Sequence, residues 1–101
     1  MNSLTLIVNS SVLRTITDQL RALDVSGFTV CHVEGHGAHT AEDPLLSARD
    51  RVEGFVPRVR IDILLPPEQV ERVLEAVCAR SAGVAGHGIF WVSPVDRFGQ
   101  F

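Results

Sequence analysis

Residues 55–65 alternate between aliphatic and mostly charged side chains, and this pattern constrains the fold more than any other part of the sequence. One side of the alternation is wholly aliphatic and consists of Val59, Ile61, Ile63 and Leu65. The other side is mostly charged and consists of Arg58, Arg60, Asp62 and Leu64. A period of two residues is typical of a β-strand that lies on a core with one face. The sequence therefore predicts a strand here, ended by Pro66 and Pro67.

Five further segments place this strand in a larger order. Residues 4–8 form a short apolar run, and residues 28–34 and 89–92 are rich in β-branched and aromatic side chains, which favours three more strands. Residues 12–23 and 70–77 carry apolar side chains at helical spacing. The order β-α-β-loop-β-α-β predicts an α+β fold, a ferredoxin-like βαββαβ sandwich with a long loop between the second and third strands.

One face of the predicted sheet lacks a covering layer, because two helices can cover only the other face. The open face is expected to carry Leu64 and one member of the Phe90 and Trp91 pair. An exposed apolar area of this size usually marks an interface between protein chains. We therefore expect a homo-oligomer.

The segment from His36 to Gly54 shows neither helical nor strand periodicity. A loop of 19 residues without secondary structure is unusual in a compact domain, and such loops more often serve a function than arise by accident. We therefore expect residues 36–54 to form a mobile loop that contacts a partner.

Length, charge and composition limit what kind of protein this is and which partners it can bind. A length of 101 residues fits a single domain over residues 1–101. The net charge of −3 and the lack of a basic run argue against binding to nucleic acid or to a membrane surface. No apolar stretch reaches the roughly 20 residues of a membrane span. The first strand follows the N-terminus without a basic leader, so neither membrane insertion nor a signal peptide is expected.

The reactive side chains do not form a recognisable catalytic set. Cys31 and Cys78 lack the spacing of a disulfide framework or of a zinc motif, which favours a reducing cytoplasm. None of the short motifs of hydrolases, metalloproteases or P-loop proteins is present. Asp62 and Glu53 could act as acid or base, but the sequence does not pair them. The expectation is therefore that the chain is not an enzyme.

Two glycine pairs are the most informative candidates for a binding site. Gly35 and Gly37 follow the second predicted strand, and Gly86 and Gly88 precede the last one. Glycine lets a ligand approach main-chain N–H groups closely, although each pair taken alone is more often simply a turn. Arg58 and Arg60 lie on one strand face, where they could bind a carboxylate or a phosphate, or form a salt bridge with Asp62 or with an acidic residue of a helix.

The histidines leave a metal site open as an alternative. Cys31 and His32 point to opposite faces of a strand, so they cannot share one ion without distortion. His36 and His39 have a locally plausible spacing for zinc or copper, but two ligands make a weak site. Histidines that are solvated or hydrogen-bonded remain the other interpretation.

Three segments resemble PII signal-transduction proteins. They are residues 27–37 with Gly27, Phe28, Thr29, Val30, Val33, Gly35 and Gly37, residues 55–61, and the glycine-rich residues 86–92. Their spacing is similar to that of the family through nearly the whole chain. Residues 49–55 and 91–95 resemble a short, divergent PII-like subgroup whose members are often encoded beside heavy-metal efflux pumps or bicarbonate transporters.

This resemblance implies a homotrimer with ligand clefts between subunits. It also implies that residues 36–54 correspond to the T-loop, which engages a membrane transporter or an enzyme. The residues that would line the cleft are Thr29, Gly35, Gly37, Gly86, His87 and Gly88. Arg58 would lie near the base of the loop. In the metal alternative, His36 and His39 would instead bind zinc or copper in connection with efflux.

Four positions depart from the usual PII pattern and narrow the expected ligand. Arg51 stands where the family has its modified tyrosine, and His39 stands where it has a glutamine that supports 2-oxoglutarate binding. Ile89 replaces a phosphate-binding lysine, and Arg97 alone remains of a basic tail. Lost cations weaken charge-assisted hydrogen bonds to phosphates. Combined ATP and 2-oxoglutarate sensing is therefore not expected. The ligand stays unknown, with an adenine nucleotide (ADP or AMP) as one candidate and zinc or copper as the alternative.

Overall fold

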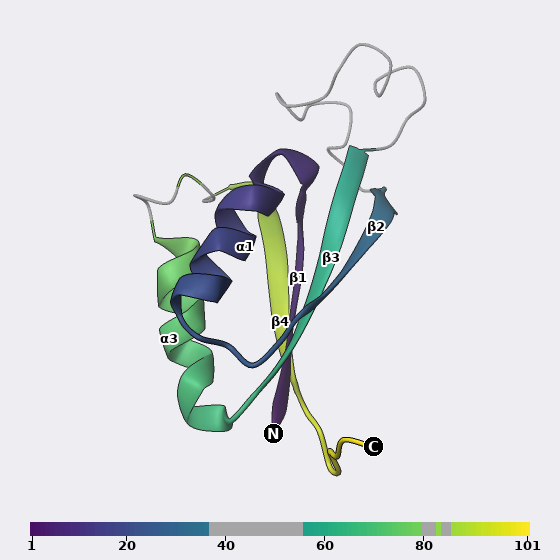
Figure 1. Cartoon of the computed structure of the whole chain (residues 1–101). Helices are drawn as coiled ribbons and strands as arrows, with labels where there is room; N and C mark the ends of the chain where they lie inside the picture. Colours follow the sequence, from purple (N-terminus) through teal and green to yellow (C-terminus); the bar gives the residue numbers. More distant parts are fainter. Residues whose placement is uncertain (37–55, 80–82, 84–85) are drawn as a thin grey trace.

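The computed structural model describes residues 1–36, 56–79, 83 and 86–101. In this part of the chain, a four-stranded sheet is covered on one face by two α-helices (Figure 1). The elements in chain order are β1 (Asn2–Asn9), the 3₁₀ turn η1 (Ser10–Val12), α1 (Leu13–Ala22), β2 (Thr29–Gly35), β3 (Val56–Leu65), α3 (Pro67–Cys78) and β4 (Gly88–Pro94).

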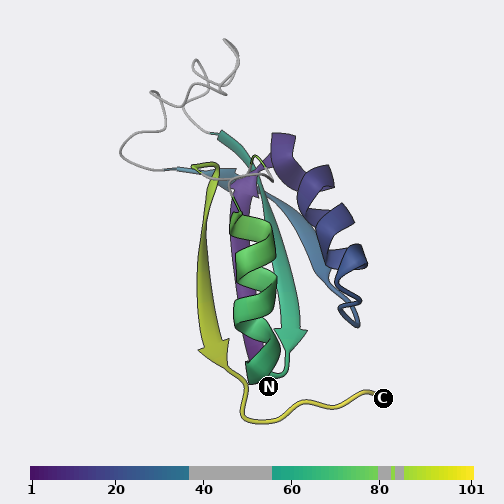
Figure 2. The same ribbon diagram turned by 90° about the vertical axis from the view of Figure 1, so that its left-hand side faces the viewer.

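The strand order is β2-β3-β1-β4, and all neighbouring strands are antiparallel. The two central strands are therefore β1 and β3, and the two edges are β2 and β4. Figure 2 shows the two helices side by side in front of this sheet. This arrangement confirms the predicted ferredoxin-like α+β fold.

The ends of the elements follow from local chemistry. The side chain of Asn9 accepts a hydrogen bond from the Ser11 N–H at 2.9 Å and so caps the turn that leads into α1. Asp24 adopts a left-handed φ of 55° where the chain leaves α1. Pro67 begins α3, where its missing N–H costs no helical hydrogen bond.

The core lies between the helices and the covered face of the sheet. Its members are aliphatic side chains at most 8% exposed, namely Leu4, Leu6, Val8, Val12, Ile16, Leu20, Val59, Ile61, Ile63, Leu65, Val70, Val73, Leu74 and Val77. Arg72 also links the helices, because its Nη2 donates to the Leu23 carbonyl at 3.3 Å. The predicted aliphatic side of residues 59–65 thus faces the core, as its period of two requires.

The pairing register separates the two faces of the sheet. Trp91 lies opposite Thr5 on the open face, whereas Phe90 lies opposite Leu6 on the face that carries the helices. Leu64 is 37% exposed and Trp91 is 40% exposed, so the open face carries the two apolar side chains that were expected there. Among the described residues, no helix is long and apolar enough to cross a membrane.

Candidate ligand site at the glycine turn

Three elements meet at one end of the sheet, where the turn before β4 contacts the ends of β1 and β3. The backbone N–H of Asn9 donates to the His87 carbonyl at 2.8 Å. The Nη1 of Arg58 donates to the same carbonyl at 3.5 Å, which is a long contact. The structure therefore brings together the predicted site residues Arg58 and His87, with Gly86 and Gly88 on either side of His87.

Gly88 has a structural reason for being glycine. A Cβ atom at this position would lie 2.5 Å from the Ile7 carbonyl oxygen and 2.7 Å from Cγ1 of Val8. These distances are well below van der Waals contact, so only glycine lets β4 approach β1 here. The sequence pattern suggested close approach of a ligand, whereas the structure shows close approach of a neighbouring strand.

Gly86 differs from Gly88 because its surroundings are open. Its φ of +83° is favourable only for glycine, and an added Cβ would meet no described atom within 4 Å. Among the described residues, the turn is therefore packed against β1 at Gly88 and uncrowded at Gly86. Main-chain groups next to open space are accessible to a ligand.

The remaining predicted residues fall into three groups. Gly35 lies opposite Val56 at the same end of the sheet as Arg58, close to where the described chain stops before residue 37. Thr29 lies opposite Asp62, four residues or roughly 13 Å along β3 from Arg58. A single chain therefore does not bring Thr29 to the turn. Gly37 and His39 lie outside the described residues.

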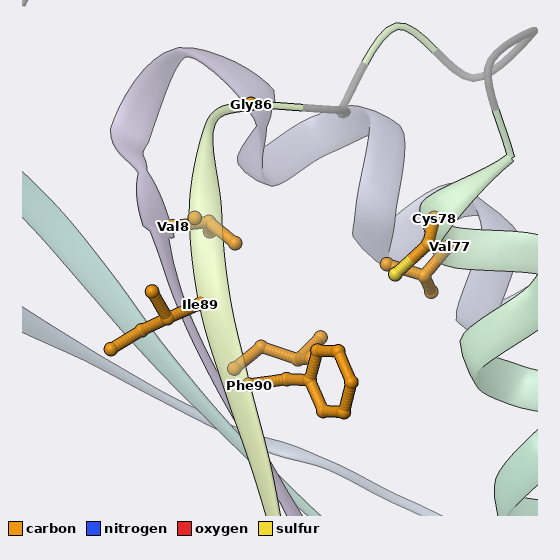
Figure 3. A pocket seen from close by; sticks show the side chains of 8 residues that line it. Val8, Val77, Cys78, Gly86, Ile89 and Phe90 are labelled. Carbon is orange, nitrogen blue, oxygen red and sulfur yellow. The ribbon is translucent and has the colours of Figure 1, made fainter.

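An apolar pocket of about 220 Å³ opens beside the turn, between β4 and the end of α3. Its lining residues are Leu6, Val8, Val77, Cys78, Gly86, Gly88, Ile89 and Phe90. In Figure 3, Val77 and Cys78 face Val8 and Phe90 across the gap between the helix and the strand. The sequence did not indicate this pocket, since helical periodicity assigned Val77 simply to the core and left Cys78 unplaced.

A polar network lies farther along the open face and involves the second arginine of β3. Thr5 donates from Oγ1 to Asp62 Oδ1 at 2.8 Å, and Arg60 donates from Nε to Asp62 Oδ2 at 2.9 Å. The Arg60 guanidinium also lies 5.7 Å from the centre of the Trp91 ring. Arg60 is therefore engaged in a salt bridge, which was one of the two interpretations of this side chain.

The network changes the pKa of its two charged residues, Asp62 and Arg60. The hydrogen bond from Arg60, together with that from Thr5, holds the pKa of Asp62 below its ordinary value against the opposing effect of burial. The hydrogen bond and charge of Asp62 raise the pKa of Arg60. Both groups are charged at neutral pH, so neither is suited to transfer a proton there.

The described residues do not assemble a full metal site. His36 Nε2 lies 3.1 Å from Glu34 Oε2, and both side chains are exposed. No group of three or more His, Cys, Asp or Glu side chains that could hold a metal ion occurs in the described ranges. Cys31 and His32 lie on opposite faces of β2, as the strand period predicted.

The chain is distantly similar to PII proteins among its curated relatives. The chain is 29% identical to "Nitrogen regulatory protein P-II" of Cereibacter sphaeroides, over 96% of this chain and 88% of the relative. It is 26% identical to "Nitrogen regulatory protein GlnK" of Escherichia coli K12, with the same coverage. These similarities confirm the resemblance that residues 27–37, 55–61 and 86–92 carry.

The particular family follows from a match over the whole chain. The family model described as "Protein of unknown function (DUF3240)" matches residues 1–101, and the chain belongs to this family. A crystal structure of a DUF3240 family protein from Shewanella baltica OS155 has the same fold, with a TM-score of 0.76 and 21% sequence identity. That similarity covers 99% of this chain and 94% of the other.

Proposed function

We propose that this protein is a PII-like regulatory protein that binds a small ligand at the glycine turn and acts on another protein without catalysing a reaction. The carrying observation is the convergence of Arg58 and the Gly86–Gly88 turn at the end of the sheet from which residues 37–55 depart. A ligand bound at this place would contact a cation, open backbone and the ends of the strands that flank the segment. The similarity to nitrogen regulatory proteins supports a regulatory role.

The proposed ligand is an adenine nucleotide, ADP or AMP. The turn separates two complementary environments, because Gly86 and Gly88 line the apolar pocket while the His87 carbonyl meets Arg58. An apolar pocket suits a flat ring, and a guanidinium suits a phosphate. A nucleotide that lay across the turn would use both environments.

The proposed assembly is a homotrimer with the ligand in clefts between subunits. Thr29 is too far along the sheet from Arg58 to join the turn of its own chain. A second copy could supply it, and the exposed Leu64 and Trp91 on the open face support contact between copies. Ligand binding would then shift the conformation of residues 36–54 and change their affinity for a membrane transporter or an enzyme in the cytoplasm.

A thermal-shift comparison tests the ligand and its place. Wild type, Arg58→Ala and the charge-matched control Arg14→Ala, which alters an exposed side chain of α1, are melted with AMP, ADP, ATP, zinc or copper. A nucleotide at about 100 times its Kd stabilises the folded state by roughly 2.7 kcal/mol, which is a shift on the order of 10 °C. We expect this shift in wild type and Arg14→Ala, and a much smaller one in Arg58→Ala.

Two outcomes contradict the proposal. An equal nucleotide shift in Arg58→Ala places the nucleotide elsewhere. Stabilisation by zinc or copper alone, lost in His36→Ala, favours the metal-binding alternative that pairs His36 with His39.

A further inference from the structure

The apolar pocket beside the glycine turn is small, and its lining is chemically uniform. Its volume of about 220 Å³ is below the roughly 300–1,000 Å³ of pockets that enclose a whole drug-sized ligand, so it suits a ring and not a complete nucleotide. None of the described residues that line it has a nitrogen or oxygen atom in its side chain, and the thiol of Cys78 is the most polar group. These side chains therefore offer contact area to a ring but no strong hydrogen bond.

The two walls of the pocket come from different layers of the fold. Val77 and Cys78 at the end of α3 face Val8 and Phe90 of the sheet across the gap (Figure 3). Phe90 is 51% exposed, so part of its ring is open to a ligand. Aromatic side chains stack against nucleobases without strong preference, because every base has a flat π-face.

The backbone groups of β4 do not point into this gap. The Asn9 N–H donates to the His87 carbonyl at one end of the β1–β4 ladder, and the Val95 N–H donates to the Met1 carbonyl at the other. The N–H and C=O groups of a strand lie in the plane of its sheet, whereas side chains stand out from the two faces. The side chain of Phe90 lies on the face that carries the helices. A ring between α3 and this face therefore meets side chains and not the hydrogen-bonding groups of β4.

We propose that this pocket holds the base of the ligand by its flat area and does not distinguish adenine from guanine or hypoxanthine. Arg58 places a positive charge on the other side of the glycine turn, which complements a phosphate. The ligand class is then a purine nucleotide, of which ADP and AMP are two members. The inference rests on the proposed function, because it uses the same site, and it adds the rule by which that site selects its ligand.

Discrimination between similar ligands depends on hydrogen-bonding groups in the site. A site built to hydrogen-bond a substrate rejects an analogue that lacks the bond by roughly 10⁴–10⁵-fold, whereas an apolar pocket discriminates between isosteres by only about 100-fold or less. Adenine, guanine and hypoxanthine share one bicyclic ring and differ in the donors and acceptors on its edges. A pyrimidine has a single ring, so it covers less of Phe90 and buries less apolar area.

Calorimetric titration of wild type with ADP, GDP, IDP, CDP and UDP, at one salt concentration, tests the selection rule. We expect the dissociation constants of the three purine nucleotides to agree within about threefold, and those of CDP and UDP to be about tenfold higher. A preference of roughly 100-fold or more for ADP over GDP and IDP overturns the inference. Equal affinity for all five nucleotides overturns it too, because ring area would then play no part.

An alanine variant of Phe90 tests the place of the ring. Phe98→Ala is the matched control, because Phe98 is similarly exposed at 47% and does not line the pocket. Phe90→Ala should weaken ADP and GDP by the same factor, roughly tenfold, and should leave ribose 5-phosphate, which has no base, unchanged. Phe98→Ala should bind all three as wild type does. A loss for ADP alone, or an equal loss for ribose 5-phosphate, contradicts the placement of the ring against Phe90.

A second variant keeps the inference testable if Phe90→Ala does not fold. Cys78 is exposed at the end of α3, so Cys78→Leu fills the pocket without disturbing the core. It should weaken ADP and GDP alike and spare ribose 5-phosphate, and unchanged binding of ADP would overturn the inference. The outcomes also separate the two proposals. Binding that is selective for ADP overturns the inference alone, whereas a wild type that binds no nucleotide overturns the proposed ligand as well.

Discussion

The two faces of the sheet are built from alternate residues of the same strands, yet they are organised in different ways. On the covered face, Ile61 and Ile63 are completely buried among aliphatic side chains. On the open face, the neighbouring Asp62 is bonded to Thr5 and Arg60, with Trp91 and Leu64 exposed nearby. The side chains of the covered face pack against other residues of the same chain. The open face satisfies its polar groups but leaves apolar area for a second surface.

The largest expected difference between the faces is in the response to loss of an aliphatic side chain. Ile61→Ala removes a fully buried side chain and should lower the free energy of unfolding by about 2–5 kcal/mol. Leu64→Ala, on the same strand but on the open face, should cost about 1 kcal/mol or less and should instead weaken self-association. Urea denaturation and sedimentation provide the two readouts. If Ile61→Ala and Leu64→Ala lowered the free energy of unfolding by the same amount, the two faces would not differ in how they stabilise the fold.

A second difference concerns the end of the sheet where the glycine turn meets β1. Gly88→Ala forces a Cβ to within 2.5 Å of the Ile7 carbonyl and should destabilise the fold by about 1–3 kcal/mol. Gly99→Ala is the matched control, because an added Cβ there meets no described atom within 4 Å. Thermal unfolding of both variants gives the comparison. An unchanged melting temperature in Gly88→Ala would mean that β4 does not approach β1 as closely as described.

A smaller effect is expected within the polar network of the open face. Thr5 is buried, and its hydroxyl donates to Asp62, so Thr5→Val should lower stability by about 1 kcal/mol. Thr15→Val on the exposed side of α1 provides the control. If the two variants lose the same stability, the buried hydrogen bond contributes nothing measurable.

The smallest expected effect is a pH dependence that comes from Asp62. Its folded-state pKa lies below the ordinary value, so the charged form stabilises the fold at pH values above the unfolded pKa of about 4. This contribution should disappear as the pH falls through the folded-state pKa. Melting temperatures of wild type should therefore decrease more steeply below about pH 4 than those of Asp62→Asn. Parallel profiles would show that Asp62 is not the group responsible.

The sequence predicted the covered face better than the open one, for a physical reason. Burial imposes a period that is visible in Val59 to Leu65, and both helices were located in the same way. The first strand was predicted too short, because Asn2 and Ser3 are polar and extend β1 only through backbone pairing with β3 and β4. Local patterns do not record pairing between distant strands.

The candidate site was predicted only in part. The glycine pattern correctly indicated a turn before the last strand, but it could not distinguish Gly88, which fits against β1, from Gly86, which faces open space. Arg58 and Arg60 looked equivalent in the sequence. They differ in register and rotamer: Arg58 reaches the His87 carbonyl, whereas Arg60 pairs with Asp62. The pocket beside Phe90 requires the packing of α3 on the sheet and has no local sequence signal.

The most direct test of this account is the mass of the wild-type protein in solution, measured by sedimentation equilibrium across micromolar concentrations. The apolar side chains exposed on the open face and the distance of Thr29 from Arg58 are the observations that support the proposed homotrimer. The account predicts three chains per particle at every concentration in this range. A single chain throughout would contradict it, because the proposed ligand cleft between subunits could not then form.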